Sequence, residues 1–240
     1  MSVIPPDFPH STAINAHGFY CIPGTFRKRE VAQMLLKGEV NEPRTLSLMR
    51  QFAGNGDVVS GGAFVGDFLP FLSRSLKRGA YLHSFEPNPT GFAATTMTVA
   101  LNDLTNVRLS PVAVGNETGV LPLLVADAAG KQMGGTSMIV AEAQEGRTVD
   151  VEIVRIDDLV PADRKVSVLQ LDIEGYEWQA LEGAPQTIGK GHPLIVLETL
   201  AAQDPREIEK KLRALCPAAD YTFMGMIERN AFYKPFKSKK

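Results

Sequence analysis

Apolar runs and amphipathic stretches alternate along most of the chain, and this alternation predicts an α/β fold. The apolar runs are rich in Val, Leu and Ile, which is typical of strands buried on both faces of a parallel sheet. The stretches between them repeat apolar positions at helical spacing and are bounded by Asn, Pro or Gly. The predicted strands are residues 57–61, 80–86, 107–114, 165–171 and 193–198, and the predicted helices are residues 66–78, 88–103, 176–183 and 205–215.

Two parts of the chain break this rhythm, because they contain strand-like runs with no helix between them. Residues 120–126, 137–141 and 148–155 predict the strands of an antiparallel insertion at about 120–155. Residues 221–236 predict one or two closing strands that are antiparallel at least in part. The expected architecture is therefore a mostly parallel, Rossmann-like sheet with helices on both faces and an antiparallel insertion.

Residues 1–53 predict a mostly helical lead-in to a main domain that comprises residues 54–240. Residues 1–25 hold four prolines and two glycines, so this part is expected to be irregular. Residues 27–38 and 43–52 carry apolar side chains at helical spacing and predict two helices. We expect the lead-in to cover an edge of the sheet, and the alternative is that it forms part of a lid.

Composition and charge narrow the range of partners. The formal net charge of −2 gives no electrostatic reason to expect a nucleic acid. Cys21 and Cys216 stand far apart without metal-ligand spacing, as thiols do in a reducing compartment. The first residues lack the pattern of a signal peptide, and no apolar stretch reaches the roughly eighteen residues of a membrane span. We expect a cytoplasmic protein with no stable membrane insertion, and a possible homodimer through the exposed edge of the insertion.

A glycine-rich turn follows the first predicted strand. Gly61 and Gly62 can adopt positive φ and have no Cβ that would push a ligand away. Gly66 is expected to let the next helix start close to the strand, with its free N–H groups facing the ligand. Glu86 ends the second strand about twenty residues later, where a carboxylate usually binds the two hydroxyls of an adenosine ribose. The turn and the acid together predict an adenosine-like ligand.

Acidic side chains end several of the predicted parallel strands, where ligands bind in open α/β sheets. They are Asp67, Glu86, Asp172, Glu174 and Glu198. Acids that converge at one edge favour an occupant that is cationic or rich in hydroxyl groups, and adenosine joined to a sulfonium centre is both. A dinucleotide is less favoured, because Asp67 would repel a phosphate at that turn. The pattern therefore favours S-adenosylmethionine.

Several short motifs occur in a fixed order over roughly residues 55–235. Besides the glycine turn they are Ser84-Phe-Glu-Pro-Asn88, Asn106-Val-Arg-Leu109 with Ala113-Val-Gly115, Leu171-Asp-Ile-Glu-Gly-Tyr-Glu177 and Leu197-Glu198. This order resembles that of FkbM-type methyltransferases, and the Asp-Ile-Glu-Gly-Tyr-Glu stretch is its most specific part.

The resemblance implies a seven-stranded, class I S-adenosylmethionine-dependent fold whose members usually methylate a hydroxyl on a sugar, a lipid-linked glycan or a polyketide. It implies that Glu86 binds the ribose, that Ala113 lies near the adenine, and that Asp172 and Glu174 face the reacting centre as the catalytic residues. The expected cofactor-binding residues are Gly61, Gly62, Ala63, Phe64, Gly66, Asp67, Glu86, Pro87, Asn88, Ala113 and Asp172.

Two positions depart from the family pattern. Many members open the glycine turn with Asp-Ile-Gly-Ala-Asn, whereas this chain has Ser60 at the first of these positions. A carboxylate that would hold the methionine ammonium is therefore missing there, and Asp67 is the expected replacement. The later motif often begins with Lys, and this chain has Gln170.

Asp172 and Glu174 leave several roles open. Asp172 would hold the methionine amino group or orient the acceptor hydroxyl, and Glu174 would accept a proton. In one alternative the two acids bind Mg²⁺ together with water, and in another they cap the helix that follows. We expect no metal. Residues 134–137 are expected either as a wall of the pocket, which the family resemblance suggests, or as a hairpin turn.

The sequence thus predicts an S-adenosylmethionine-dependent O-methyltransferase for a small-molecule or glycan acceptor. One alternative is an NAD(P)-dependent oxidoreductase, although Gly61-x-Ala63-x-x-Gly66 fits its fingerprint only loosely and no Tyr-x-x-x-Lys pair follows the fourth strand. The other is a non-catalytic binding subunit with a methyltransferase fold, which Ser60 and Gln170 would indicate.

Overall fold

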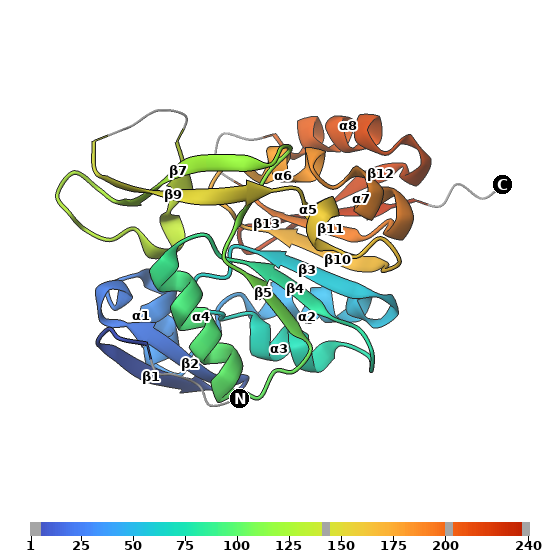
Figure 1. The fold of residues 1–240 in the computed structure, drawn as a ribbon. Coiled ribbons are helices and arrows are strands. Elements are labelled where there is room, and N and C mark those ends of the chain that lie inside the picture. The colour runs from blue at the N-terminus through green and yellow to red at the C-terminus, as the bar shows by residue number, and fades with distance from the viewer. Residues whose placement is uncertain (1–5, 141–144, 200–203, 237–240) are drawn as a thin grey trace.

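A computed structural model describes residues 6–140, 145–199 and 204–236, and it centres on a seven-stranded sheet (Figure 1). The strands from β11 to β5 are parallel, β13 runs antiparallel to β11, and β12 runs antiparallel to β13. The mostly parallel sheet is therefore confirmed. In spatial order the strands are β12 (Tyr221–Ile227), β13 (Asn230–Pro235), β11 (Leu194–Glu198), β10 (Val166–Leu171), β3 (Asp57–Gly61), β4 (Leu82–Phe85) and β5 (Val107–Ser110).

The register of the central strands brings their carboxyl ends to one level. Gly61 at the end of β3 pairs with Leu171 of β10 and with Phe85 of β4, and Leu171 pairs with Leu197 of β11. The residue that follows Gly61 is Gly62 of the glycine turn. The residues that follow the other three are the predicted acids Glu86, Asp172 and Glu198. Four segments that lie far apart in the sequence therefore meet at one edge of the sheet.

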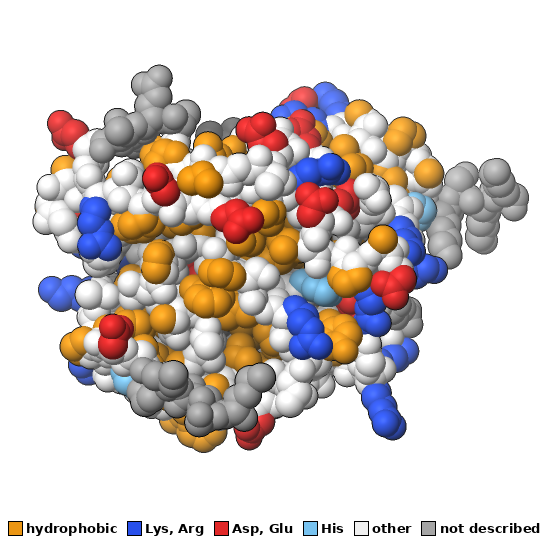
Figure 2. Space-filling model, viewed as in Figure 1, with side chains coloured by type: hydrophobic (Ala, Val, Ile, Leu, Met, Phe, Trp, Pro, Cys, Tyr) orange, Lys and Arg blue, Asp and Glu red, His pale blue; other side chains and the backbone are white. Residues whose placement is uncertain are grey.

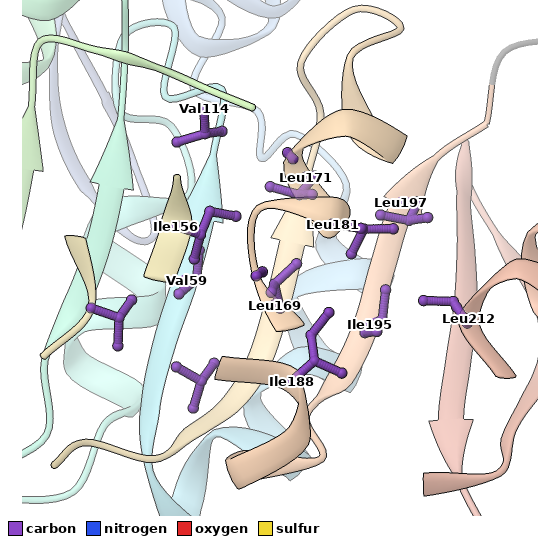
Figure 3. Close-up of a cluster of buried hydrophobic side chains, with 14 of the residues drawn as sticks. Val59, Val114, Ile156, Leu169, Leu171, Leu181, Ile188, Ile195, Leu197 and Leu212 are labelled. Atoms are coloured by element: carbon purple, nitrogen blue, oxygen red, sulfur yellow. The ribbon is translucent and has the colours of Figure 1, made fainter. Parts of the chain in front are cut away.

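Helices cover both faces of the central sheet, because successive strand residues point to opposite sides. On one face, α2 (Pro43–Phe52) and α3 (Leu69–Ser75) pack Leu46 and Leu72 against Val58 of β3. On the other face lie α6 (Glu177–Glu182), α7 (Pro185–Gly191) and α8 (Pro205–Leu215). Figure 3 shows their side chains Leu181, Ile188 and Leu212 with those of the strands. Burying each such side chain contributes about 1.5–3 kcal/mol.

The insertion forms a second sheet beside the first, as predicted, but it begins earlier than expected. Its strands, in the order β6-β9-β7-β8, are β6 (Ala113–Val114), β9 (Arg147–Val154), β7 (Gly119–Ala126) and β8 (Met138–Ile139). The single strand predicted at 107–114 is wrong, since β5 belongs to the central sheet and β6 to the insertion sheet. Pro111 separates them, and proline has no N–H with which to continue a ladder.

The N-terminal segment is not irregular, because β1 (His10–Asn15) and β2 (Gly18–Pro23) form an antiparallel hairpin. The hairpin packs on α4 (Pro89–Leu101), where Cys21 N donates to Thr98 Oγ1 at 3.1 Å, and not on an edge of the central sheet. The two helices predicted next, α1 (Glu30–Leu36) and α2, are present.

Other elements complete the described chain. The first helix after the glycine turn, predicted from residue 66, begins only at Leu69. The short helix α5 (Ile156–Leu159) and α7 were not predicted. On the face shown in Figure 2, acidic and basic side chains are interspersed and form no patch of one sign. Within the described ranges, no helix combines the length and the apolar character that crossing a bilayer requires.

Candidate functional site

A cavity of about 610 Å³ lies at the carboxyl edge of the central sheet. Its wall comes from the glycine turn, the ends of β4, β10 and β11, the insertion, the start of α1 and of α2, and the turn between β12 and β13. The predicted site residues in the lining are Gly62, Ala63, Phe64, Asp67, Glu86, Pro87, Ala113, Asp172 and Glu174, whereas Gly61, Gly66 and Asn88 lie outside it.

Gly62 holds the turn against the neighbouring strand. It has φ +83°, and a Cβ there would lie 1.7 Å from the backbone oxygen of Asp172. Gly62 N and Ala63 N both donate to Phe85 O, at 3.2 and 3.1 Å. The turn is thereby fixed to β4 on one side and to the end of β10 on the other, and only glycine fits at this position.

Glu86 lines the cavity with 6% of its surface exposed. Its Oε2 accepts Phe64 N at 2.6 Å and its Oε1 accepts Asn88 N at 2.9 Å. Burial raises the pKa of Glu86 to about 7, although these two backbone donors lower it. Each carboxylate oxygen keeps lone-pair capacity for a further donor, such as a ribose hydroxyl.

Gly91, which the sequence reasoning did not single out, packs against Glu86 from outside the cavity lining. A Cβ at Gly91 would lie 3.0 Å from the Cδ of Glu86, so the glycine makes room for this carboxylate at the first turn of α4. Asn88 has a related structural role, because its Oδ1 caps α4 by accepting Thr90 N and Gly91 N at 3.0 and 3.2 Å. The adjacent Asn88-Pro89 pair is the signal from which the start of this helix was predicted, and the structure confirms it.

Asp67 enters the cavity from the end of the glycine turn. Its Oδ2 accepts Asn41 Nδ2 at 2.9 Å, and burial raises its pKa to about 6. Gly66, which precedes it, serves packing instead of ligand contact: a Cβ there would lie 3.1–3.2 Å from the methyl carbons of Thr98 and Thr95 on α4. The prediction that Gly66 starts a helix facing the ligand is therefore wrong.

Three carboxylates meet opposite the glycine turn. Asp172, Glu174 and Glu198 each place one oxygen within 4.8 Å of the other two. Burial, a hydrogen bond to Glu198 and the charges of Glu198, Glu174 and Glu42 raise the pKa of Asp172 well above its ordinary value. Burial and the same kind of repulsion raise the pKa of Glu174 to about 7. Glu198 was noted as a strand-end acid but not predicted as a site residue.

This triad bears on two of the alternatives for Asp172 and Glu174. It could coordinate a divalent cation, since Mg²⁺ favours carboxylates together with water. The capping alternative does not match the structure, because Tyr176 is the N-cap of α6 and no side chain accepts a capping hydrogen bond there. Glu177 Oε1 accepts Ile173 N at 3.0 Å and Gly175 N at 3.1 Å, and so fixes the turn that precedes the helix. Glu174 itself has φ +55°, which turns the chain sharply after β10.

The insertion supplies one wall of the cavity through the short turn Gly134–Thr136. This turn packs on the ring of Phe64, where a Cβ at Gly134 or Gly135 would lie 3.2 Å from ring carbons. Ser137 Oγ accepts Asn88 Nδ2 at 3.0 Å and ties the turn to the start of α4. The pocket-wall prediction for residues 134–137 is confirmed.

Comparison with known proteins adds the family to this geometry. The family model for the methyltransferase FkbM domain matches residues 57–223. The chain belongs to the FkbM methyltransferase family. "Methyltransferase 1" of Beauveria bassiana (strain ARSEF 2860) is 26% identical over 153 residues, which are 55% of this chain and 59% of that protein.

A solved structure of an FkbM methyltransferase from Methylobacillus flagellatus KT superimposes with a TM-score of 0.53 and 18% identity. The match covers 75% of this chain and 43% of that one. The fold is the class I S-adenosylmethionine-dependent methyltransferase fold, with the mostly parallel seven-stranded sheet described above. The chain spans about three fifths of the length of the fungal relative.

The two departures from the FkbM pattern contact each other. Ser60 and Gln170 pair in register on β3 and β10, and Ser60 Oγ donates to Gln170 Oε1 at 2.6 Å. Both side chains are buried and both line the cavity. Where many members have Asp and Lys, this chain thus has a neutral hydrogen-bonded pair.

Proposed function

We propose that this chain is an S-adenosylmethionine-dependent O-methyltransferase whose acceptor is a hydroxyl of a sugar, a glycan or a polyketide-type small molecule. The observation that supports it most is the set of acids around one cavity above the glycine turn. Eight acidic side chains line it, five of them at the carboxyl edge of the sheet, and among the described residues its only basic side chains are Arg29 and Arg229. Such a cavity suits a cationic, hydroxyl-rich ligand.

The residues present fit the cofactor that the family implies. Glu86 offers a buried carboxylate to two vicinal hydroxyls, and Phe64 and Ala113 give apolar surface for a base. Asp67 and Asp172 border the glycine turn, where a positive group would offset the burial and the repulsion that raise the pKa of Asp172. When bound, S-adenosylmethionine supplies a methyl group on a positively charged sulfur.

The chain's own residues would align the acceptor and remove its proton. Alignment of two reactants in one cavity can lower a barrier by roughly 7–11 kcal/mol in favourable cases. Glu174, with its pKa raised to about 7, takes up a hydroxyl proton near neutral pH, and general-base assistance of this kind is worth roughly 10²–10⁴ in rate. Asp172 orients the hydroxyl.

The surroundings support a small acceptor over a macromolecular one. The net charge of −2 and the acidic lining do not favour a polyanion such as a nucleic acid. Both cysteines are free and buried, which accords with the cytoplasm as the proposed compartment. A homodimer stays a prediction.

Calorimetry with S-adenosylhomocysteine tests the proposal without knowledge of the acceptor. The wild-type protein should bind one equivalent, and Glu86→Gln should weaken binding about 10- to 100-fold, because it loses charge-assisted hydrogen bonds. The matched control is Glu152→Gln, which changes an exposed acid of β9 and should leave the affinity unchanged. Tighter binding of NAD(P) than of S-adenosylhomocysteine would indicate an oxidoreductase, and binding of neither at millimolar concentration would overturn the proposal.

A further inference from the structure

Two consecutive residues at the start of α1 connect opposite walls of the cavity. Arg29 Nη2 donates to Gln132 O at 2.6 Å, in the segment that leads to the insertion turn. Glu30 Oε2 accepts Arg229 Nη2 at 3.2 Å, in the turn between β12 and β13. Arg29, Glu30 and Arg229 all line the cavity. The start of α1 therefore bridges the cavity from the insertion to the far end of the central sheet.

The bridge is anchored firmly on the insertion side. Phe26, which is fully buried, stacks on Phe64 with ring centroids 5.5 Å apart. Gly134 packs against both rings at this contact, since a Cβ there would lie 3.2 Å from each of them. Phe64 N donates to Glu86, so Phe64 belongs both to the anchor of the bridge and to the predicted ribose site.

The opposite side of the bridge is held weakly. The side chains of Glu30 and Arg229 are 71% and 65% exposed, and exposed ion pairs contribute little to stability. The anchored side, in contrast, combines a buried aromatic pair with a charge-assisted hydrogen bond. A segment with one strong and one weak attachment opens at the weak one.

We propose that the start of α1, residues 29–34, is a gate over the cavity, with its hinge at Phe26 and its latch at the Glu30–Arg229 pair. Arg29 and Glu30 are positioning residues that set how fast ligands enter and leave. Val31 and Met34 face the cavity from the same helix, so opening the latch would also withdraw apolar surface from the bound ligand. The identity of the exchanging ligand rests on the proposed function.

The kinetic test measures the dissociation rate of S-adenosylhomocysteine by stopped-flow competition. Glu30→Gln should raise this rate about two- to fivefold, because it removes the latch, and Arg29→Gln should raise it less than about twofold, because the latch stays closed. High salt should raise the wild-type rate to that of Glu30→Gln, because salt screens an exposed pair. Arg27→Gln, an exposed neighbour, is the matched control and should change nothing. Equal dissociation rates in all four proteins would overturn the gate.

A second measurement is independent of any ligand and therefore of the proposed function. Hydrogen–deuterium exchange of the free protein should be faster in residues 30–36 of Glu30→Gln than of the wild type, and unchanged in β3 and β10. Arg29→Gln, which keeps the latch, should give a smaller increase in the same residues. Unchanged exchange there would refute the gate, whereas failure of S-adenosylhomocysteine to bind the wild type would refute only the proposed function.

Discussion

Buried acids at the two ends of the central sheet have pKa values that are shifted in opposite directions. At the amino end, Asp57 is 1% exposed and accepts His83 Nε2, Arg164 Nε and Tyr81 N, each at 2.9 Å. Burial alone would raise its pKa, but these donors outweigh burial and lower the pKa below the ordinary value. At the carboxyl end, burial prevails and raises the pKa of Glu86 to about 7.

The difference indicates what each end is for. An acid that serves the fold is neutralised by the chain itself, since an uncompensated buried charge costs stability. An acid that awaits a ligand is left without a cation of its own, and its pKa is raised in the free protein. The positions of the cations, more than those of the acids, therefore separate the structural end of this sheet from the end that we propose binds the ligand.

The largest expected change in the free energy of unfolding comes from a substitution at the amino end of the sheet. Asp57→Asn should lower the free energy of unfolding by about 3–5 kcal/mol, because Arg164 and His83 lose a buried partner. Urea denaturation at pH 7 measures this loss. The affinity for S-adenosylhomocysteine of the folded fraction should stay within twofold of the wild type. A loss below about 1 kcal/mol would mean that the amino-end network is not structural.

The pH dependence of stability is the next largest effect, and its sign follows from the raised pKa values. Glu42, Glu86 and Glu174 have pKa values of about 7 in the folded state, against about 4.5 when unfolded. The folded protein binds more protons between these values, so this stability is full below about pH 4.5 and is lost as pH rises through about 7.

The ligand-free protein should therefore be more stable at about pH 5.5 than at about pH 8, by about 2 kcal/mol from the buried Glu86 alone. Thermal or urea unfolding across this range measures the difference. Asp57, with its lowered pKa, contributes in the opposite direction and only at more acidic pH. Stability that rises steadily from pH 5.5 to pH 8 would contradict the account of the carboxyl end.

A single substitution at the carboxyl end should have the opposite sign to Asp57→Asn. Glu86→Gln removes an uncompensated buried charge and should stabilise the free protein at about pH 8 by about 1–2 kcal/mol. Near pH 5 the effect should vanish, because the wild-type carboxyl is then protonated. Destabilisation at pH 8 as large as that of Asp57→Asn would erase the contrast between the two ends.

The smallest expected effect on stability concerns the hydrogen-bonded pair of Ser60 and Gln170 near the carboxyl edge of the sheet. Ser60→Ala leaves the amide of Gln170 without its buried partner and should cost about 1 kcal/mol of stability. The affinity for S-adenosylhomocysteine should change less than threefold, which calorimetry measures. A loss of affinity as large as that of Glu86→Gln would place Ser60 among the ligand contacts.

The sequence predicted the parts of the site that depend on local pattern. The central parallel strands β3, β4, β10 and β11 are short buried runs, and an acid or a glycine ends each of them at the sheet edge. Glu86 and Asp172 were found in this way. Contacts between distant segments have no such signal. Nothing local indicates that Phe26 stacks on Phe64 or that Ser60 faces Gln170.

The N-terminal hairpin shows why other elements were missed. Its two-residue turn is Ala16-His17 and not the Asn-Gly or Asp-Gly that marks such hairpins, and prolines flank its strands. The hairpin is stabilised by packing on α4, which only the folded chain provides. For the same reason the start of α1 could not be placed over the cavity from its helical spacing alone.

A crystal structure with S-adenosylhomocysteine tests the central claim most directly, because it shows which end of the sheet receives the ligand. The account predicts the ribose hydroxyls on the carboxylate of Glu86, the base beside Phe64 and Ala113, and the sulfur facing Asp172 across the glycine turn. A nucleoside bound away from Glu86, or a Glu86 carboxylate that makes no contact with the ligand, would contradict it.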